Sequence, residues 1–66
     1  MIWLFERRGA HLRCETRKTP EGTYELVVTD EHGTERVERF DSPAALARRQ
    51  VDVEQQLADE GWSFGV

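Results

Sequence analysis

The sequence predicts an α+β domain in which a four-stranded antiparallel meander is followed by one C-terminal helix. Up to Phe40 the apolar residues alternate with period two, a pattern typical of strands with one packed and one wet face. Clusters of turn residues divide this part of the chain, and from Ser42 onward the apolar spacing becomes helical. A chain of 66 residues has room for one domain, so we expect residues 1–66 to form a single unit.

The first two strands are expected at residues 2–7 and 11–17, joined by a turn around Gly9. The second strand separates its side chains by character, with Leu12, Cys14 and Thr16 on one face and His11, Arg13, Glu15 and Arg17 on the other. One face of the sheet should therefore pack on the core and the other should meet water.

The third and fourth strands are expected at residues 23–29 and 34–40, after a turn at KTPEG. The sequence DEHG between them suits a type I turn followed by a left-handed glycine, which makes a three-residue hairpin loop. If Asp30 pairs with Thr34, the partners are Val27 with Val37, Glu25 with Arg39, and Tyr24 with Phe40.

An alternative four-residue loop would set Glu25 against Glu38, so we prefer the first register, which brings together an opposite-charge pair and an aromatic pair. The preferred register leaves Arg36 and Glu38 on the packed side of the sheet. We therefore expect the fourth strand to be an edge, where charged residues discourage aggregation.

The helix is predicted at residues 43–60. Ser42 is a favourable N-cap, Pro43 suits the first helical position, and Gly61 is placed to end the helix in a left-handed conformation. One stripe should lie on the sheet with Ala45 and Trp62 beside it; it comprises Leu46, Gln50, Val53 and Leu57. The last four residues, SFGV, are the one candidate tail.

A second stripe of small residues lies on the opposite side of the helix and comprises Ala44, Ala47, Val51 and Ala58. Two interpretations are open. In the first, the stripe reflects only helix propensity, because alanine is common in helices and loses no side-chain entropy. In the second, the stripe is a contact with a second copy of the chain.

The opening MIWLF lacks the features of an export signal or a membrane span. Only five apolar residues precede the charges of Glu6, Arg7 and Arg8, and a secretory peptide places positive charge before a longer apolar region. A membrane helix needs about 20 apolar residues. We therefore expect a cytoplasmic protein with no membrane partner.

A domain this small usually needs an extra source of stability. Cys14 is the only cysteine, so a disulfide within the chain is excluded. The possible zinc ligands are His11, Cys14 and His32, one fewer than a structural site requires. We expect no metal and no cofactor, and a homodimer is the source of stability that remains.

Composition and motifs weigh against several functions. The net charge of −4 opposes DNA and anionic membranes, so binding of nucleic acid would have to use a local patch. Phosphate-binding glycine loops and HExxH are missing, and strand alternation turns His11 and Cys14 to opposite faces. We therefore expect that the protein is not an enzyme. We expect no catalytic residues and no small-molecule substrate.

The orientation of the first strand decides which side chains lie on the outer surface of the sheet. If its aromatic residues point outward, rings and guanidinium groups combine into a site for single-stranded DNA or RNA, comprising Trp3, Phe5, Arg7, Arg13, Arg17 and Arg39. If they point inward, Ile2 and Leu4 are outside and the outer face is an ordinary charged surface. Burial is favoured, because large aromatic rings supply the most apolar area to a small core.

The element order, with RVERFDSPAALARRQ leading from a strand into an amphipathic helix, resembles the PUR-type nucleic-acid-binding repeat. More distantly, it is similar to other ββββα single-strand binders such as the Whirly class, and it also looks like many short bacterial open reading frames. The PUR resemblance implies that two repeats pair through their helices and sheet edges. This chain departs from the pattern in being acidic and in holding one repeat, and a homodimer would complete the unit.

Three functions follow in order of preference. The first is a small non-enzymatic interaction module that forms a homodimer, with both faces of the first strand apolar so that one is covered by the helix and the other by a partner. The second is a binder of single-stranded nucleic acid. The third is an inhibitor that mimics charge, which ranks last because the acidic residues are dispersed among arginines.

Overall fold

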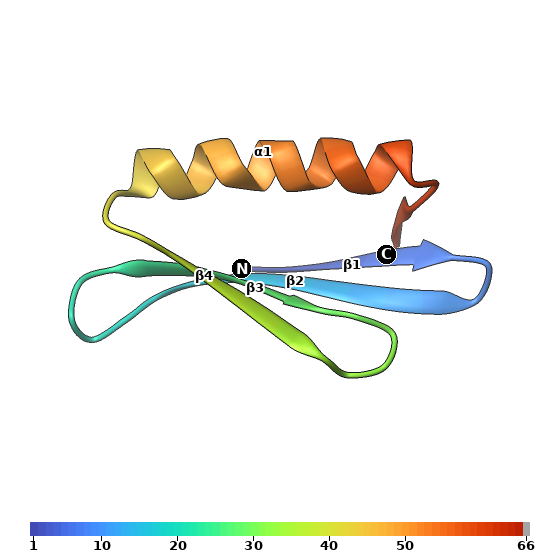
Figure 1. The fold of residues 1–66 in the computed structure, drawn as a ribbon, viewed down its shortest axis with the longest axis horizontal. Helices are drawn as coiled ribbons and strands as arrows, with labels where there is room; N and C mark the ends of the chain where they lie inside the picture. Colours follow the sequence, from blue (N-terminus) through green and yellow to red (C-terminus); the bar gives the residue numbers. More distant parts are fainter. Residues whose placement is uncertain (66) are drawn as a thin grey trace.

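A computed structural model of the chain describes residues 1–65 and confirms the α+β prediction. A single helix lies along one side of an antiparallel sheet, as Figure 1 shows. The elements are β1 (Ile2–Arg7), β2 (Ala10–Lys18), β3 (Tyr24–Thr29), β4 (Glu35–Phe40), α1 (Pro43–Asp59) and β5 (Ser63–Gly65). The strand order across the sheet is β4-β3-β2-β1-β5, so the four predicted strands form the expected meander.

The short strand β5 is a difference from the sequence prediction, which treated residues 63–66 as a tail. After the helix the chain returns to the sheet and pairs antiparallel with β1, with Phe64 opposite Phe5. The two rings meet edge to face with their centroids 5.7 Å apart. This aromatic contact and the backbone pairing hold residues 63–65 against the sheet. Val66 lies outside the described residues.

The two outer hairpins close in tight turns. In the β1–β2 turn, Arg8 and Gly9 both have positive φ, 51° and 82°, between paired residues Arg7 and Ala10. This is the pattern of a two-residue type I′ turn, whose twist matches that of the flanking strands. In the β3–β4 turn, the Asp30 carboxylate accepts hydrogen bonds from the backbone N–H groups of His32 and Thr34.

The predicted β3–β4 register is confirmed. Asp30 pairs with Thr34 through an N–H to carbonyl bond of 3.0 Å, and Gly33 occupies the left-handed position with φ of 82°. The resulting partners are Tyr24 with Phe40, Glu25 with Arg39, and Val27 with Val37.

Strand β4 is an edge, also as predicted. Its charged residue Glu38 faces the helix, where both carboxylate oxygens accept from Nε of Arg49 on α1 at 3.1 Å. This ion pair explains how a carboxylate fits on the packed side of the sheet, because α1 supplies its partner at the edge of the core.

The helix begins and ends where its capping residues predict. The Ser42 hydroxyl accepts a hydrogen bond of 3.1 Å from the N–H of Ala45, and Pro43 follows the cap. At the other end Gly61 has φ of 91°, its N–H donates to Ala58, and the N–H of Trp62 donates to Leu57. These two bonds form a Schellman motif, which turns the chain back toward the sheet.

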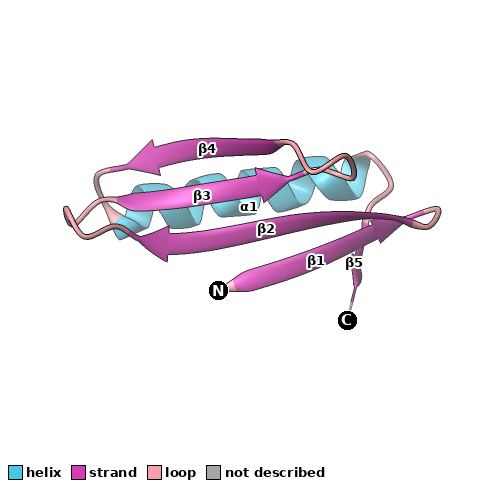
Figure 2. Cartoon of the chain, turned by 90° about the horizontal axis from the view of Figure 1, so that it is seen from below, coloured by secondary structure: helices cyan, strands magenta, loops and turns pink. Residues whose placement is uncertain are grey.

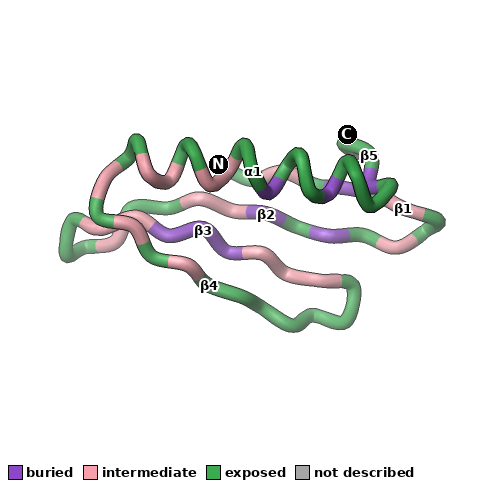
Figure 3. The backbone as a smooth tube through the Cα atoms, turned by 45° about the horizontal axis from the view of Figure 1, so that its top comes forward, coloured by how far each residue is buried: buried purple, intermediate pink, exposed green. Residues whose placement is uncertain are grey.

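The core lies between the helix and the middle of the sheet, as the buried segments in Figure 3 show. Side chains from the strands meet the predicted helix stripe and Trp62 just beyond it. The buried cluster comprises Phe5, Leu12, Cys14, Leu26, Val53, Leu57 and Trp62. The core occupies one face of the sheet, and no helix lies over the opposite face within residues 1–65.

Candidate functional site

The candidate site is the sheet face that lies away from the helix, which we call the open face. Figure 2 views the strands from this side with α1 behind them, and no element within residues 1–65 covers them. Strand pairing places the following side chains on it: Ile2, Leu4, Glu6, His11, Arg13, Glu15, Arg17, Glu25, Val27, Thr29, Glu35, Val37 and Arg39. The predicted polar face of β2 belongs to it in full.

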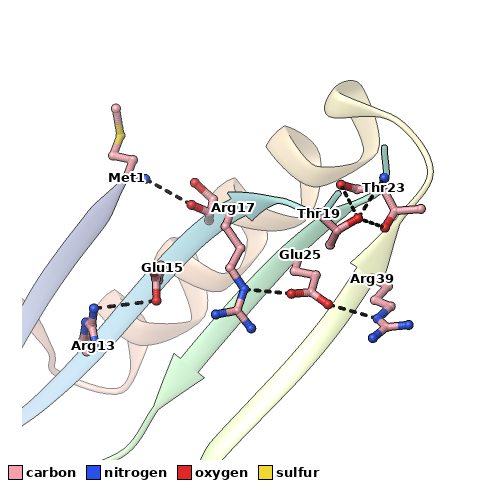
Figure 4. Close-up of polar contacts among 9 residues, drawn as sticks. Met1, Arg13, Glu15, Arg17, Thr19, Thr23, Glu25 and Arg39 are labelled. Carbon is pink, nitrogen blue, oxygen red and sulfur yellow. Dashed lines mark hydrogen bonds and ion pairs between the residues drawn. The ribbon is translucent and has the colours of Figure 1, made fainter. Parts of the chain in front are cut away.

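A buried carboxylate occupies the end of the open face nearest the β2–β3 turn. Glu25 on β3 lies directly across from Arg17 on β2 and from Arg39 on β4. One carboxylate oxygen accepts from Nε of Arg17 at 2.8 Å and the other from Nε of Arg39 at 3.0 Å (Figure 4). Its side chain is 7% exposed, whereas those of the two arginines are 50% and 77% exposed.

The two arginines keep this carboxylate charged. The hydrogen bond from Arg17 is the main reason that the pKa of Glu25 lies below its ordinary value; burial opposes the shift, and Arg39 reinforces it. Glu25 in turn raises the pKa of Arg17. The three side chains therefore form a fixed cluster of charges on the open face.

The third arginine of the open face is also paired. Arg13 lies 3.6 Å from a carboxylate oxygen of Glu15, two residues along the same strand (Figure 4). Each arginine predicted on this face thus has a carboxylate beside it. With Glu6 and Glu35 added, the open face carries three arginines and four glutamates, which gives it little attraction for a phosphate backbone.

Aliphatic side chains fill the space between the charged ones. Ile2 and Leu4 on β1 are 52% and 45% exposed, and Val37 on β4 is 47% exposed. Val27 lies between these strands and is only 3% exposed, although the helix is on the other side of the sheet. Its cross-strand neighbours Glu15 and Val37 flank it and shield it from water.

The six residues predicted to bind nucleic acid do not share a surface. Arg13, Arg17 and Arg39 lie on the open face, whereas Trp3, Phe5 and Arg7 lie on the helix face. Phe5 is buried, and Trp3 is partly buried and packs against the core. The rings point inward because Trp3 and Phe5 pair with Cys14 and Leu12 of β2, whose side chains face the core.

Arg7 contacts the C-terminal end of α1 and the Trp62 ring that follows it. Its Nη1 donates to the carbonyl of Glu60 at 2.9 Å, and its guanidinium carbon lies 4.5 Å from the centroid of the Trp62 ring. This side chain caps the C-terminus of the helix and ties it to the end of β1. Its donors are therefore directed away from the open face.

The small-residue stripe of the helix faces away from the sheet. Ala44, Ala47 and Ala58 are exposed, and Val51 is 64% exposed. Figure 3 shows the corresponding outer turns of α1 as exposed. The proposed dimer contact is thus accessible, although it offers one large apolar side chain.

The described residues offer little for metal or nucleophilic chemistry. Within residues 1–65 no three His, Cys, Asp or Glu side chains gather closely enough to hold a metal ion. Cys14 is buried, and burial, with a smaller contribution from Glu54, raises its pKa to about 11. A thiol with that pKa is protonated at neutral pH and is a poor nucleophile.

Two hollows outside the open face differ from typical ligand sites. A depression of about 650 Å³ beside the β1–β2 turn has charged groups of both signs in its lining, including Arg8, Glu31 and Glu60. A groove of about 270 Å³ between α1 and the β3–β4 hairpin is floored by apolar residues such as Val28 and Leu57. Small-molecule sites are mostly apolar and span roughly 300–1,000 Å³, so the first is too polar and the second is small.

The helix of the described chain is too short and too polar to cross a bilayer. In comparisons with protein families, with curated proteins and with solved structures, nothing matches this chain.

Proposed function

We propose that this chain is a small non-enzymatic interaction module that works as a homodimer. The observation that carries the proposal is the uncovered open face, on which Ile2, Leu4 and Val37 leave about half of their surface in water. A domain of this size buries a smaller share of its apolar surface than a larger one, so covering a second sheet face would add stability that the core alone does not supply.

The charge pattern supports a protein partner. Protein interfaces are enriched in arginine and surround an apolar centre with a polar rim. The resemblance to the PUR-type repeat implied pairing of two repeats, and a second copy of this chain would supply the second one.

Single-stranded nucleic acid is the less supported alternative. A phosphate group would have to displace Glu25 or Glu15 from an arginine that each already holds. The stacking rings that such a site needs are on the other side of the sheet.

Sedimentation equilibrium over micromolar to submillimolar concentrations tests the proposal. We expect a mass that approaches twice the 7.7 kDa of one chain as concentration rises. A mass of 7.7 kDa at every concentration would overturn the homodimer.

A further inference from the structure

We infer that two copies of the chain pair through their open faces, related by a two-fold axis that runs parallel to the strands between β2 and β3. This inference rests on the proposed homodimer and names the surface that forms it. It replaces the helix stripe of Ala44, Ala47, Val51 and Ala58 as the dimer contact.

The open face has the area that a stable dimer requires. Helix and sheet are stacked in the plane of Figure 1, so the sheet face spans the longest and shortest extents, 38 and 18 Å. These extents limit its footprint to about 700 Å², which is of the order of the ~800 Å² that each partner contributes to a standard interface. The outer side of a 17-residue helix, about 26 Å long and about 10 Å wide, presents roughly 260 Å².

The charges of the open face are suited to a copy of the same face. A two-fold interface brings one surface against itself, so the surface must carry both members of each complementary pair. Three arginines and four glutamates are interspersed across β1, β2, β3 and β4. The face could therefore approach its own copy without a large repulsion between like charges.

The direction of the axis follows from the strand register. Strand pairing aligns Ile2, Glu15, Val27 and Val37 in one row across the sheet, and Arg17, Glu25 and Arg39 in the next row. An axis between β2 and β3 exchanges β1 with β4 and β2 with β3 across the interface. Ile2 then lies opposite the partner's Val37, and Arg17 lies opposite the partner's Glu25.

The other in-plane axis fits the charges less well. An axis running across the strands would place each strand against its own copy, which brings Arg17 toward the partner's Arg13. Like charges placed opposite each other in an interface are unfavourable. The axis along the strands instead gives each buried carboxylate a third arginine, and it seats Ile2 of β1 on the partner's Val37 of β4.

Charge insertion tests the surface. We expect Ile2→Glu and Val37→Glu each to reduce the sedimenting mass to that of one chain. Each would replace the aliphatic contact between Ile2 and the partner's Val37 with a carboxylate, and would add negative charge to a face that already has more glutamates than arginines. The matched control Val51→Glu alters the helix stripe and should stay dimeric. Circular dichroism and thermal melting of each variant verify that it is folded.

Cross-linking tests the axis with substitutions that introduce no charge. In a Cys14→Val background, Ile2→Cys and Val37→Cys chains are mixed and treated with a short bismaleimide that spans the ~10 Å between packed sheets. We expect cross-linked dimers in the mixture and none from either variant alone. Two copies of the same residue would stand three strand spacings, about 14 Å or more, apart.

The outcomes separate the two claims. A wild-type chain that is monomeric overturns the proposed function and this inference together. A wild-type dimer that Val51→Glu dissociates and Val37→Glu does not would overturn the inference alone. Dissociation by Val37→Glu but not by Ile2→Glu, with cross-links between two copies of Val37→Cys, would show that the β4 edges pair and would also overturn it.

Discussion

Nε of Arg17 donates a 2.8 Å hydrogen bond to Glu25, so a side chain half in water holds a carboxylate that is almost fully buried. The contact joins β2 to β3 on the face of the sheet that has no helix over it. Arg39 completes the arrangement from β4. The open face is thus organised by charged side chains, and this organisation leads to the first prediction.

Glu25→Gln should flatten the pH dependence of stability. The pKa of Glu25 is lowered in the folded chain, mainly by Arg17, so its contribution is present above the ordinary pKa of about 4.5 and is lost as the pH falls through the folded value. Urea unfolding should show the variant less stable than wild type at neutral pH, with the difference shrinking on acidification. The control Glu35→Gln changes an exposed carboxylate of the same face. A constant difference between Glu25→Gln and wild type at all pH values would contradict the prediction.

Arg7→Met should destabilise the chain by about 1–2 kcal/mol. The substitution removes the hydrogen bond to the Glu60 carbonyl, worth about 1 kcal/mol, and the cation–π contact with Trp62, worth about 0.5–1 kcal/mol. The midpoint of urea denaturation measures the loss. Arg8→Met is the matched control, because Arg8 is an exposed residue in the adjacent turn. Equal effects of the two substitutions would refute a capping role for Arg7.

Cys14 should react with a thiol reagent only when the fold opens. The side chain is buried and its pKa is about 11, so at pH 8 roughly one thiol in a thousand would be ionised even if the reagent reached it. We expect slow modification by Ellman's reagent in buffer and rapid stoichiometric modification in high urea. Immediate complete labelling of the folded chain would show that the core around Cys14 is accessible.

Mixed oligonucleotides should leave the tryptophan fluorescence unchanged at low salt. Trp3 is partly buried against the core, Trp62 is buried beneath Arg7, and neither lies on the face that holds the paired arginines. A stacking site would quench the signal and weaken as salt increases. Saturable quenching with that salt dependence would restore nucleic-acid binding as the function.

Local rules were sufficient to predict much of this fold. The Asp30 and Gly33 turn predicted the β3–β4 register and therefore the contact between Glu25 and Arg39. Ser42, Pro43 and Gly61 predicted both ends of the helix, because capping depends on residues within a few positions of each other. Each of these features is decided within a short stretch of chain.

Features that depend on distant contacts were beyond sequence reasoning. Strand β5 has three residues, too few for a period to be recognised, and it pairs with β1, where Phe64 contacts Phe5. The bond between Arg7 and Glu60 joins residues 53 positions apart. The orientation of β1 could not be decided by alternation, since Ile2 and Leu4 are as apolar as Trp3 and Phe5. Pairing with the core side of β2 decides it.

The sequence predicts only part of the open face, because the rest depends on contacts between residues far apart in the chain. The arginines of β2 and β4 were placed on the wet face, but their neutralisation by Glu15 and Glu25 depends on side-chain geometry and on the β2–β3 register. The KTPEG segment predicts a turn between these strands but does not specify which residues pair across them. The exposure of Ile2 and Leu4 on the open face can be predicted only when it is known that Trp3 and Phe5 point into the core.

The pairing of open faces is tested most directly by isotope-filtered NOE spectroscopy on a mixture of labelled and unlabelled wild-type chains. This measurement detects contacts between copies without altering any residue. We predict intermolecular NOEs between the methyl groups of Ile2 and the partner's Val37. A spectrum whose intermolecular NOEs come only from Ala47 and Val51 of the helix, or one with none, would contradict the account.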